Sequence, residues 1–222
     1  GHPQVLLVPA EHTEKTLASD LFSGGGFTVQ GETALRSAEL LRASPGERLL
    51  DACAAPGGKT AVLAASGARI VACDSNLDRL LRVGGGLRRL APCGRVDFVV
   101  CDAVQGLAPD TFDGVLVDVP CSNTGVLAQR PEARWRFGPA SMRSLAELQE
   151  RILSECAARV KPGGRLVYST CSLEPEENRR RIEAFLVSHP GFVLDEEVEA
   201  LPDPVTSAGP TDGGYAARLR RS

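Results

Sequence analysis

The sequence predicts an α/β fold with a mostly parallel, seven-stranded sheet and helices on both of its faces. From about residue 48 onward, short β-branched runs alternate with longer amphipathic or charged stretches. The runs are nearly continuous in apolar residues, as is typical of parallel strands covered on both faces. Four of the first five runs also end at an aspartate. This alternation predicts right-handed β-α-β units and a three-layer sandwich.

Each element follows from its local pattern. An amphipathic stretch at 31–43, which ends before Ser44-Pro45-Gly46, predicts the first helix. Two late strands are expected at 192–198 and 215–221, joined by a mobile loop at 201–214 that is rich in proline and glycine. The five main strands are expected at residues 48–51, 68–74, 96–102, 112–120 and 164–171, and the helices between them at 59–66, 76–91, 140–160 and 175–188.

Length and composition favour one folded unit. A chain of 222 residues with 43% apolar and 24% charged residues can build one substantial core but hardly two. We expect this domain at 27–222, preceded at 1–26 by an N-terminal extension or linker remnant, with Gly1-His2 resembling a cloning remnant. No apolar run approaches the roughly 20 residues that cross a bilayer, and no signal-peptide pattern is present, so a cytoplasmic protein without a membrane partner is expected.

Cysteine spacing and net charge exclude several kinds of site. Seven cysteines form no CxxC pair, and the three histidines stand far apart in sequence, so neither a metal site nor a disulfide framework is expected. A net charge of −3 argues against a chain that holds nucleic acid by charge alone. If the substrate is a nucleic acid, another domain or partner is expected to help bind it.

Aspartates follow four of the main strands, at positions 51, 74, 102 and 118. The carboxyl ends of parallel strands share one edge of the sheet, where doubly wound folds bind ligands. Aspartate also caps helices and starts turns, which would explain any one of them. Four together predict an acidic edge that repels phosphate and favours a ligand with ribose hydroxyls, an amine and a positive centre.

The stretch DACAAPGGKT at 51–60 follows the first main strand and opens a helix. A phosphate-binding Walker A loop would need glycine where Cys53 stands, and the dinucleotide fingerprint GxGxxG is absent. Asp74 follows 16 residues after Gly58, which suits an adenosine ribose held by a carboxylate without any phosphate. S-adenosylmethionine meets this description.

Two cysteines differ in setting from the other five. Cys121 and Cys171 come just after strands, among polar turn residues, where a thiol can reach a ligand and be activated. Four of the others are expected to be small buried apolar side chains, at positions 73, 93, 101 and 156.

Three motifs, in order, resemble the RsmB-like (Fmu/Sun) family of RNA (cytosine-5)-methyltransferases. They are DACAAPGGKT at 51–60, DVPCSNTGVL at 118–127 and YSTCSLEPEEN at 168–178, each after its expected strand. The resemblance extends from about residue 27 to the C-terminus, and the paired PCS and TCS cysteines make it specific. It implies a Rossmann-like, class I S-adenosylmethionine-dependent methyltransferase that acts on RNA, with ribosomal RNA the expected substrate and transfer RNA the alternative.

The resemblance also implies roles for individual residues. Cys171 matches the nucleophile, and Cys121 matches the second cysteine, which assists release of the methylated product. Asp118 and Lys59 would lie close to both the target base and the reactive end of the cofactor. Arg130-Pro131-Glu132-Ala133-Arg134-Trp135-Arg136 resembles a stretch expected to face RNA or to be solvated surface. The implied cofactor site consists of Cys53, Ala54, Ala55, Pro56, Gly57, Gly58, Lys59, Asp74 on the ribose, Asp102 near the adenine, and Asp118.

The proposed chemistry explains these residue types. Carbon 5 of cytosine is a poor nucleophile, and addition of the Cys171 thiolate to carbon 6 would make it enamine-like. Three other functions remain open: a DNA cytosine methyltransferase with Cys121 as nucleophile, a noncatalytic assembly factor, and a nicotinamide dehydrogenase, which the missing phosphate fingerprint disfavours.

The sequence departs from the family pattern at three places. Asn123 stands where the family usually has glycine, Val119 stands where alanine is common, and Asp212-Gly213-Gly214-Tyr215 replaces a DGFF-like segment. Family members usually carry an additional RNA-binding region before the catalytic domain. We expect that region to be absent from this chain, and RNA binding to be weak.

Overall fold

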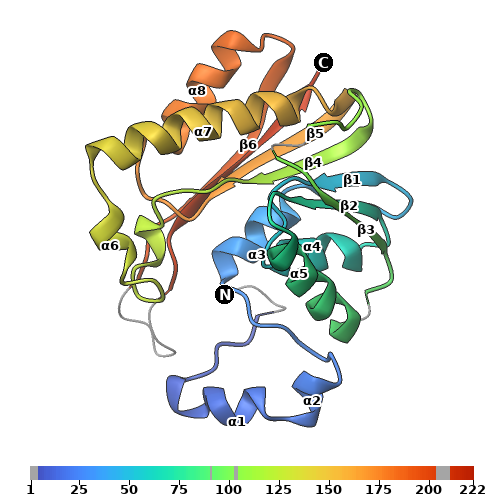
Figure 1. Ribbon diagram of the computed structural model, residues 1–222, viewed down its shortest axis with the longest axis vertical. Helices are drawn as coiled ribbons and strands as arrows, with labels where there is room; N and C mark the ends of the chain where they lie inside the picture. Colours follow the sequence, from blue (N-terminus) through green and yellow to red (C-terminus); the bar gives the residue numbers. More distant parts are fainter. Residues whose placement is uncertain (1–4, 91, 103–104, 204–210) are drawn as a thin grey trace.

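The computed structural model describes residues 5–90, 92–102, 105–203 and 211–222, and its centre is a seven-stranded sheet (Figure 1). The strand order is β3-β2-β1-β4-β5-β7-β6. The strands are β1 (Arg48–Asp51), β2 (Arg69–Asp74), β3 (Arg95–Val100), β4 (Phe112–Asp118), β5 (Val160–Thr170), β6 (Phe192–Ala200) and β7 (Gly214–Arg221).

The first five strands are parallel, and β7 is antiparallel to both of its neighbours, β5 and β6. β1 pairs with β2 on one side and with β4 on the other, so the strand order reverses between β1 and β4. In open α/β sheets, ligands bind beyond the carboxyl ends of the strands at such a reversal. The predicted Rossmann-like fold is confirmed, and its topology points to the loops that follow β1 and β4.

Helices cover both faces of the sheet (Figure 1). One face carries α3 (Glu32–Glu39), α4 (Gly58–Ala65) and α5 (Leu77–Leu90), and the other carries α7 (Pro139–Ala157) and α8 (Arg179–Ser188). The short helices are η1 (Ala10–His12), α1 (Thr13–Leu17), α2 (Asp20–Ser23), η2 (Thr124–Val126) and α6 (Ala133–Arg136).

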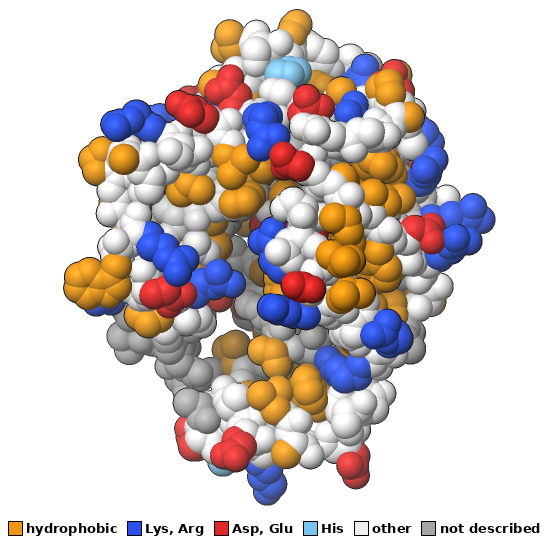
Figure 2. Space-filling view, in the orientation of Figure 1, with side chains coloured by type: hydrophobic (Ala, Val, Ile, Leu, Met, Phe, Trp, Pro, Cys, Tyr) orange, Lys and Arg blue, Asp and Glu red, His pale blue; other side chains and the backbone are white. Residues whose placement is uncertain are grey.

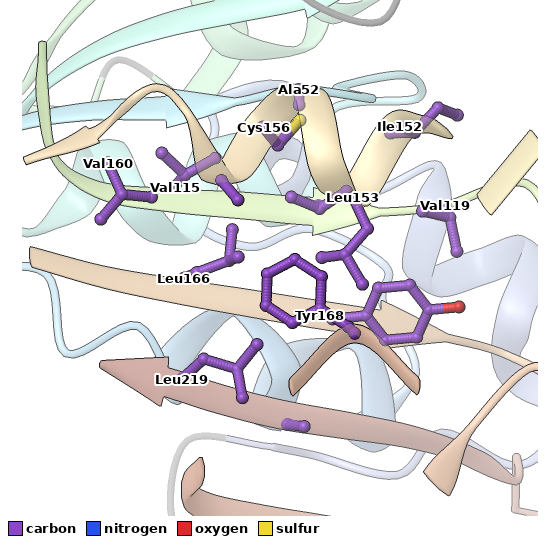
Figure 3. Close-up of a cluster of buried hydrophobic side chains, with 14 of the residues drawn as sticks. Ala52, Val115, Val119, Ile152, Leu153, Cys156, Val160, Leu166, Tyr168 and Leu219 are labelled. Atoms are coloured by element: carbon purple, nitrogen blue, oxygen red, sulfur yellow. The ribbon is translucent and has the colours of Figure 1, made fainter. Parts of the chain in front are cut away.

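The largest apolar cluster lies between α7, α8 and the middle of the sheet (Figure 3). Leu153 and Cys156 of α7 pack onto Val115 of β4 and Leu166 of β5, and all four side chains are fully buried. Burial of a complete aliphatic side chain contributes about 1.5–3 kcal/mol. This core fixes β4 and β5, the two strands whose following loops carry Cys121 and Cys171.

The N-terminal segment packs against α5. Arg89 donates hydrogen bonds to the backbone carbonyls of Phe22 and Phe27, and its guanidinium lies 4.0 Å from the centre of the Phe22 ring. Ser19 caps α2 by accepting a hydrogen bond from the Phe22 N–H. These contacts hold residues 28–30 beside the carboxyl edge of the sheet.

Several predicted boundaries are wrong. β3 ends at Val100, so Asp102 lies two residues beyond the strand. Its backbone carbonyl accepts a hydrogen bond from the Gln105 N–H. α8 begins at Arg179 rather than 175, because Pro175 starts a hydrogen-bonded turn. β5 begins at Val160, four residues before the predicted start, because its irregular first residues already pair with β4.

Two further predictions concern Cys93 and the 201–214 loop. Cys93 is exposed, not buried, because it precedes the edge strand β3 and its thiol donates to the Ala65 carbonyl. Both predicted late strands are present as β6 and β7. Residues 204–210 of the loop between them lie outside the described part of the chain. Within that part, none of the helices has the length and apolar character needed to cross a bilayer.

Candidate active site

A cavity of about 320 Å³ opens beyond the carboxyl ends of β1 and β4. One wall is the 53–59 loop, and another is formed by Thr28, Val29, Gln30 and Ala34 from the N-terminal side. Asp51 and Asp118, which end β1 and β4, complete the lining. The predicted cofactor residues 53–59 and 118 are therefore brought together at one cavity.

The 53–59 loop approaches its neighbours too closely for larger residues. The Ala54 N–H donates to the Cys73 carbonyl at 2.8 Å, which ties the loop to β2. Gly57 has a φ of 105°, and a Cβ atom there would lie 2.8 Å from the Val83 side chain. Glycine is needed at this position both for its conformation and for its size. The small residues of this loop allow a ligand in the cavity to approach the backbone closely.

Asp51 is buried and only half satisfied. Its Oδ2 accepts a hydrogen bond from Thr60 at 2.7 Å, whereas Oδ1 has no partner among the described residues. Burial raises the pKa of Asp51 to about 7, against the lowering effect of the Thr60 hydrogen bond. An unpaired buried carboxylate oxygen is costly, and Asp51 belongs to the cavity lining, so a ligand that donates a hydrogen bond or carries positive charge would be favoured there.

Lys59 and Asp118 line the cavity and also connect it to β5. Lys59 Nζ lies 2.7 Å from Asp118 Oδ2, and Asp118 Oδ1 accepts from Ser169 Oγ at 2.7 Å. Burial opposes the charge on Lys59, but the Asp118 carboxylate outweighs it, and the pKa of Lys59 is raised above its ordinary value. The pair therefore presents a fixed ammonium beside the cysteines.

The sulfur atoms of Cys121 and Cys171 lie 3.2 Å apart. The hydrogen bond from Cys121 lowers the pKa of Cys171, although burial and Asp118 act in the opposite direction. The same hydrogen bond, together with burial, raises the pKa of Cys121 well above its ordinary value. The lowered pKa of Cys171 is consistent with its predicted role as the nucleophile.

Glu177 connects the two cysteine loops. Its side chain is fully buried and accepts hydrogen bonds from four donor groups. Ser122 provides its backbone N–H and its hydroxyl, Ser172 provides its hydroxyl, and Gln149 provides its amide at 2.7 Å. Ser122 follows Cys121 and Ser172 follows Cys171, so one carboxyl group holds both loops in register.

Close packing also requires glycine beside Cys171. The Gly125 N–H donates to the Cys171 carbonyl at 3.0 Å. A Cβ atom at Gly125 would lie 2.6 Å from the Gly213 carbonyl and 2.9 Å from that of Cys171. The loops after β4 and β5 therefore touch through their backbones as well as through Glu177.

Asp74 and Asp102 do not line the cavity. Asp74 is buried, accepts from the Asn76 N–H at 2.9 Å and pairs with Arg79 at 2.8 Å. Asp102 is largely exposed and lies 3.3 Å from Arg151. The thiol of Cys53 belongs to the lining, and burial raises its pKa far above the ordinary range, which keeps it neutral.

The arginine-rich stretch at 130–136 forms an exposed surface around α6. Trp135 is 85% exposed, which is unusual for a large aromatic side chain. Figure 2 shows basic side chains gathered over α6, with apolar ones beside them. Trp135 is flanked by Arg134 and Arg136, so the surface combines positive charge with an aromatic face.

Four contributions to the site were missed or left without a role by the sequence. Residues 28–30 lie between α2 and α3 and carry no motif, and only their packing brings them to the cavity. The sequence predicts that Asp51 lies at the sheet edge but indicates no function for it. Asn123 departs from the family pattern, and Glu177 is one of three glutamates in YSTCSLEPEEN. The two consecutive glutamates gave no signal of which one is buried.

The residues present fit S-adenosylmethionine. The cavity is lined by a glycine-rich loop and by Asp51, whose buried Oδ1 is unpaired. Among the described residues, its lining includes no arginine or lysine apart from Lys59, which is already paired. Such a lining disfavours phosphate and accepts a cationic ligand. The described residues contain no group of three or more metal-ligating side chains.

Residues 38–207 match the family described as 16S rRNA methyltransferase RsmB/F. The chain is 39% identical over 211 residues to ribosomal RNA small subunit methyltransferase B of Sodalis glossinidius. It is 41% identical over 201 residues to the protein of that name from Yersinia pseudotuberculosis serotype O:1b. These alignments cover 89% and 86% of this chain but 47% and 46% of the relatives. The chain thus spans about half the length of the curated relatives it matches.

Solved structures agree in fold. The crystal structure of NSun6 from Pyrococcus horikoshii with SFG has a TM-score of 0.77 and 27% identity, over 92% of this chain and 56% of that one. A methyltransferase homolog protein from Pyrococcus horikoshii has a TM-score of 0.76 and 28% identity, over 93% and 72% of the two chains.

Proposed function

Because the chain belongs to the 16S rRNA methyltransferase RsmB/F family, we propose that it methylates carbon 5 of a cytosine in RNA, with ribosomal RNA the expected substrate. The methyl donor is S-adenosylmethionine, and the reaction passes through a covalent adduct with Cys171. The observation that carries the proposal is the pair of thiols 3.2 Å apart, with Cys171 under the electrostatic influence of Lys59 and Asp118, the ion pair that lines the cavity.

The cavity would hold the methyl donor, which supplies an electrophilic methyl group on a sulfonium centre. The 53–59 loop lies along it, and the free Oδ1 of Asp51 suits an ammonium or other donor group. Asp74 on the ribose and Asp102 near the adenine remain part of the proposal. The relative crystallised with SFG, an analogue of S-adenosylmethionine, supports this choice of donor.

Cys171 acts as the nucleophile in this proposal. Its thiolate adds to carbon 6 of the cytosine ring, and the electron pair moves toward carbon 5 and nitrogen 3. Lys59 and Asp118 would stabilise charge on the ring, since a fixed ion pair needs no reorganisation during the reaction. Carbon 5 then accepts the methyl group.

Cys121 assists release of the product. After methylation, carbon 5 must lose its proton to a base, and the carbon–sulfur bond to Cys171 must break as the ring double bond returns. A thiol 3.2 Å from the nucleophile is suited to assist this elimination. The pKa of Cys171, which is lowered by the hydrogen bond with Cys121 and by the positive charges of Lys59 and Arg130, is consistent with this division of roles.

Transfer of tritiated methyl groups to cytosine-containing RNA tests the proposal. Wild type and Cys93→Ala should be equally active, since Cys93 lies away from the cavity, and Cys171→Ala should lose at least about a thousandfold in rate. Cys121→Ala should accumulate a covalent protein–RNA species. Donor binding without incorporation into any RNA would favour a noncatalytic assembly factor, and activity that survives Cys171→Ala would refute the assignment.

A further inference from the structure

The side chain of Asn123 contacts both cysteine positions. Asn123 precedes η2 and has a left-handed backbone conformation, with φ 61° and ψ 25°. Its Nδ2 donates to the Cys121 carbonyl at 2.8 Å, and its Oδ1 lies 3.2 Å from the Cys171 sulfur. One carboxamide therefore bridges the loop after β4 and the nucleophile after β5.

The orientation of this carboxamide is determined by its partners. A backbone carbonyl oxygen can only accept, so the atom that faces the Cys121 carbonyl must be the amide nitrogen. The oxygen Oδ1 then faces the Cys171 sulfur, and it too can only accept. Cys171 can satisfy it only as a thiol, because a thiolate has no proton to donate.

The two partners of Cys171 consequently act in opposite directions. A chain of hydrogen bonds can run from the Cys121 thiol to the Cys171 sulfur and from the Cys171 thiol to Asn123 Oδ1. The first bond stabilises the thiolate of Cys171, and the second stabilises its thiol. Removal of Asn123 leaves only the bond that favours the thiolate.

We propose that Asn123 is a positioning residue that directs the Cys171 sulfur and holds it as a thiol until the target base displaces the contact. The catalytic part of this inference rests on the proposed role of Cys171 as nucleophile, whereas the effect on the thiol does not. The titratable groups with the largest effects on Cys171 are Cys121, Asp118, Lys59 and Arg130, and a change at position 123 leaves all four in place.

Glycine is the substitution that isolates the carboxamide. The left-handed conformation at position 123 is readily adopted by glycine, so Asn123→Gly removes the side chain without straining the loop. Thr124 offers a matched control in the same loop. Its hydroxyl accepts from the Leu173 N–H at 2.9 Å and contacts Ser122 and Ser172, so Thr124→Ala loosens the loop without removing a contact to either sulfur.

Alkylation of Cys171 by iodoacetamide as a function of pH tests the proposal without RNA or methyl donor. Mass spectrometry of the peptide that carries Cys171 separates it from the other six cysteines. In Asn123→Gly, the midpoint of the alkylation profile should move to lower pH by about 0.5, equivalent to about a threefold faster reaction on the acidic side. Asn123→Asp should move it to higher pH, because a carboxylate next to the sulfur disfavours the thiolate.

The proposal is overturned if the Asn123→Gly profile coincides with wild type, or if Thr124→Ala shifts it equally. It is also overturned if glycine and aspartate shift it in the same direction. In methyl transfer, Asn123→Gly should lower kcat several-fold with little change in KM for RNA. If methyl transfer fails in wild type while the alkylation shifts appear, the proposed function fails and the positioning role stands.

Discussion

The cavity beside β1 and the loops that carry the two cysteines share one edge of the sheet. They differ in how far the hydrogen-bonding capacity of their buried carboxyl groups is satisfied. In the cavity wall, one oxygen of Asp51 has no partner among the described residues. In the cysteine loops, Glu177 is equally buried and accepts hydrogen bonds from four donor groups.

The contrast indicates different tasks. An unpaired buried oxygen costs about 1–3 kcal/mol, so it persists where a ligand completes it. A fully satisfied network makes loops rigid and specifies one arrangement. We infer that the cavity is completed by its ligand, whereas the geometry of the thiols is set before any substrate binds.

The largest effect is expected where the two regions meet, at Lys59. Lys59→Met leaves the Asp118 carboxylate without its cation, which should destabilise the fold by about 3 kcal/mol and slow methyl transfer at least about a hundredfold. It should also raise the pKa of Cys171, whose thiolate Lys59 stabilises. Urea unfolding, methyl transfer and the alkylation profile measure the three effects.

Lys161 is the matched control for Lys59. It forms an ion pair of the same length, 2.7 Å, with Asp113, but it is more exposed and lies away from the cavity. Lys161→Met should cost less than about 1 kcal/mol and leave the rate unchanged. Equal losses in the two variants would mean that Lys59 has only a structural role.

Asp51→Asn is expected to increase the stability of the fold and to weaken cofactor binding. The pKa of Asp51 is about 7 in the folded protein and 3.8 as its ordinary value, so the folded state retains the proton between these pH values and stability falls as the pH rises. The substitution removes this penalty, and should stabilise the protein by about 2–3 kcal/mol at pH 8 and little near pH 4.

Calorimetry should show about tenfold weaker binding of S-adenosylmethionine to Asp51→Asn. Thermal or urea unfolding at the two pH values measures the stability term. A gain of the same size at both pH values would contradict the raised pKa, and unchanged binding would show that Oδ1 does not contact the cofactor.

Glu177→Gln tests the hydrogen-bond network between the two cysteine loops. A carboxamide has one acceptor atom in place of two and turns N–H groups toward donors, so we expect a loss of about 2 kcal/mol in stability and about tenfold in kcat. The affinity for S-adenosylmethionine should be unchanged, because Glu177 does not line the cavity. Glu176→Gln is the control, since Glu176 is exposed and forms an ion pair with Arg180 at the surface. If the affinity for S-adenosylmethionine falls as much as kcat, the cavity and the cysteine loops are not independent.

The smallest effect is expected at the α6 surface. Combined Arg134→Ala and Trp135→Ala substitutions should weaken RNA binding about three- to tenfold and reduce its salt dependence, because they remove a positive charge and a stacking surface. Filter binding at two salt concentrations measures both. Arg95→Ala, in an exposed ion pair with Asp97, is the control. A comparable loss of RNA affinity in this variant would show that RNA binding depends only on net charge.

Local sequence predicted the strands well and their ends less well. The apolar runs of β1, β2 and β4 are found at their expected places, because a continuous apolar run is stable only inside a covered sheet. Asp102 was assigned to β3 but lies beyond it, since no local feature marks where pairing with β2 stops. The start of α8 was wrong for a similar reason, because proline both starts turns and begins helices.

The sequence by itself determined the order of the elements and the loops that carry Lys59, Asp118, Cys121 and Cys171, because each loop directly follows a recognisable strand. Only the tertiary structure decided which polar groups are satisfied. Ser122 and Glu177 lie 55 residues apart, and Asn123 and Cys171 lie 48 apart. Burial and pairing across such separations depend on how the sheet brings its loops together, and no local pattern contains that information.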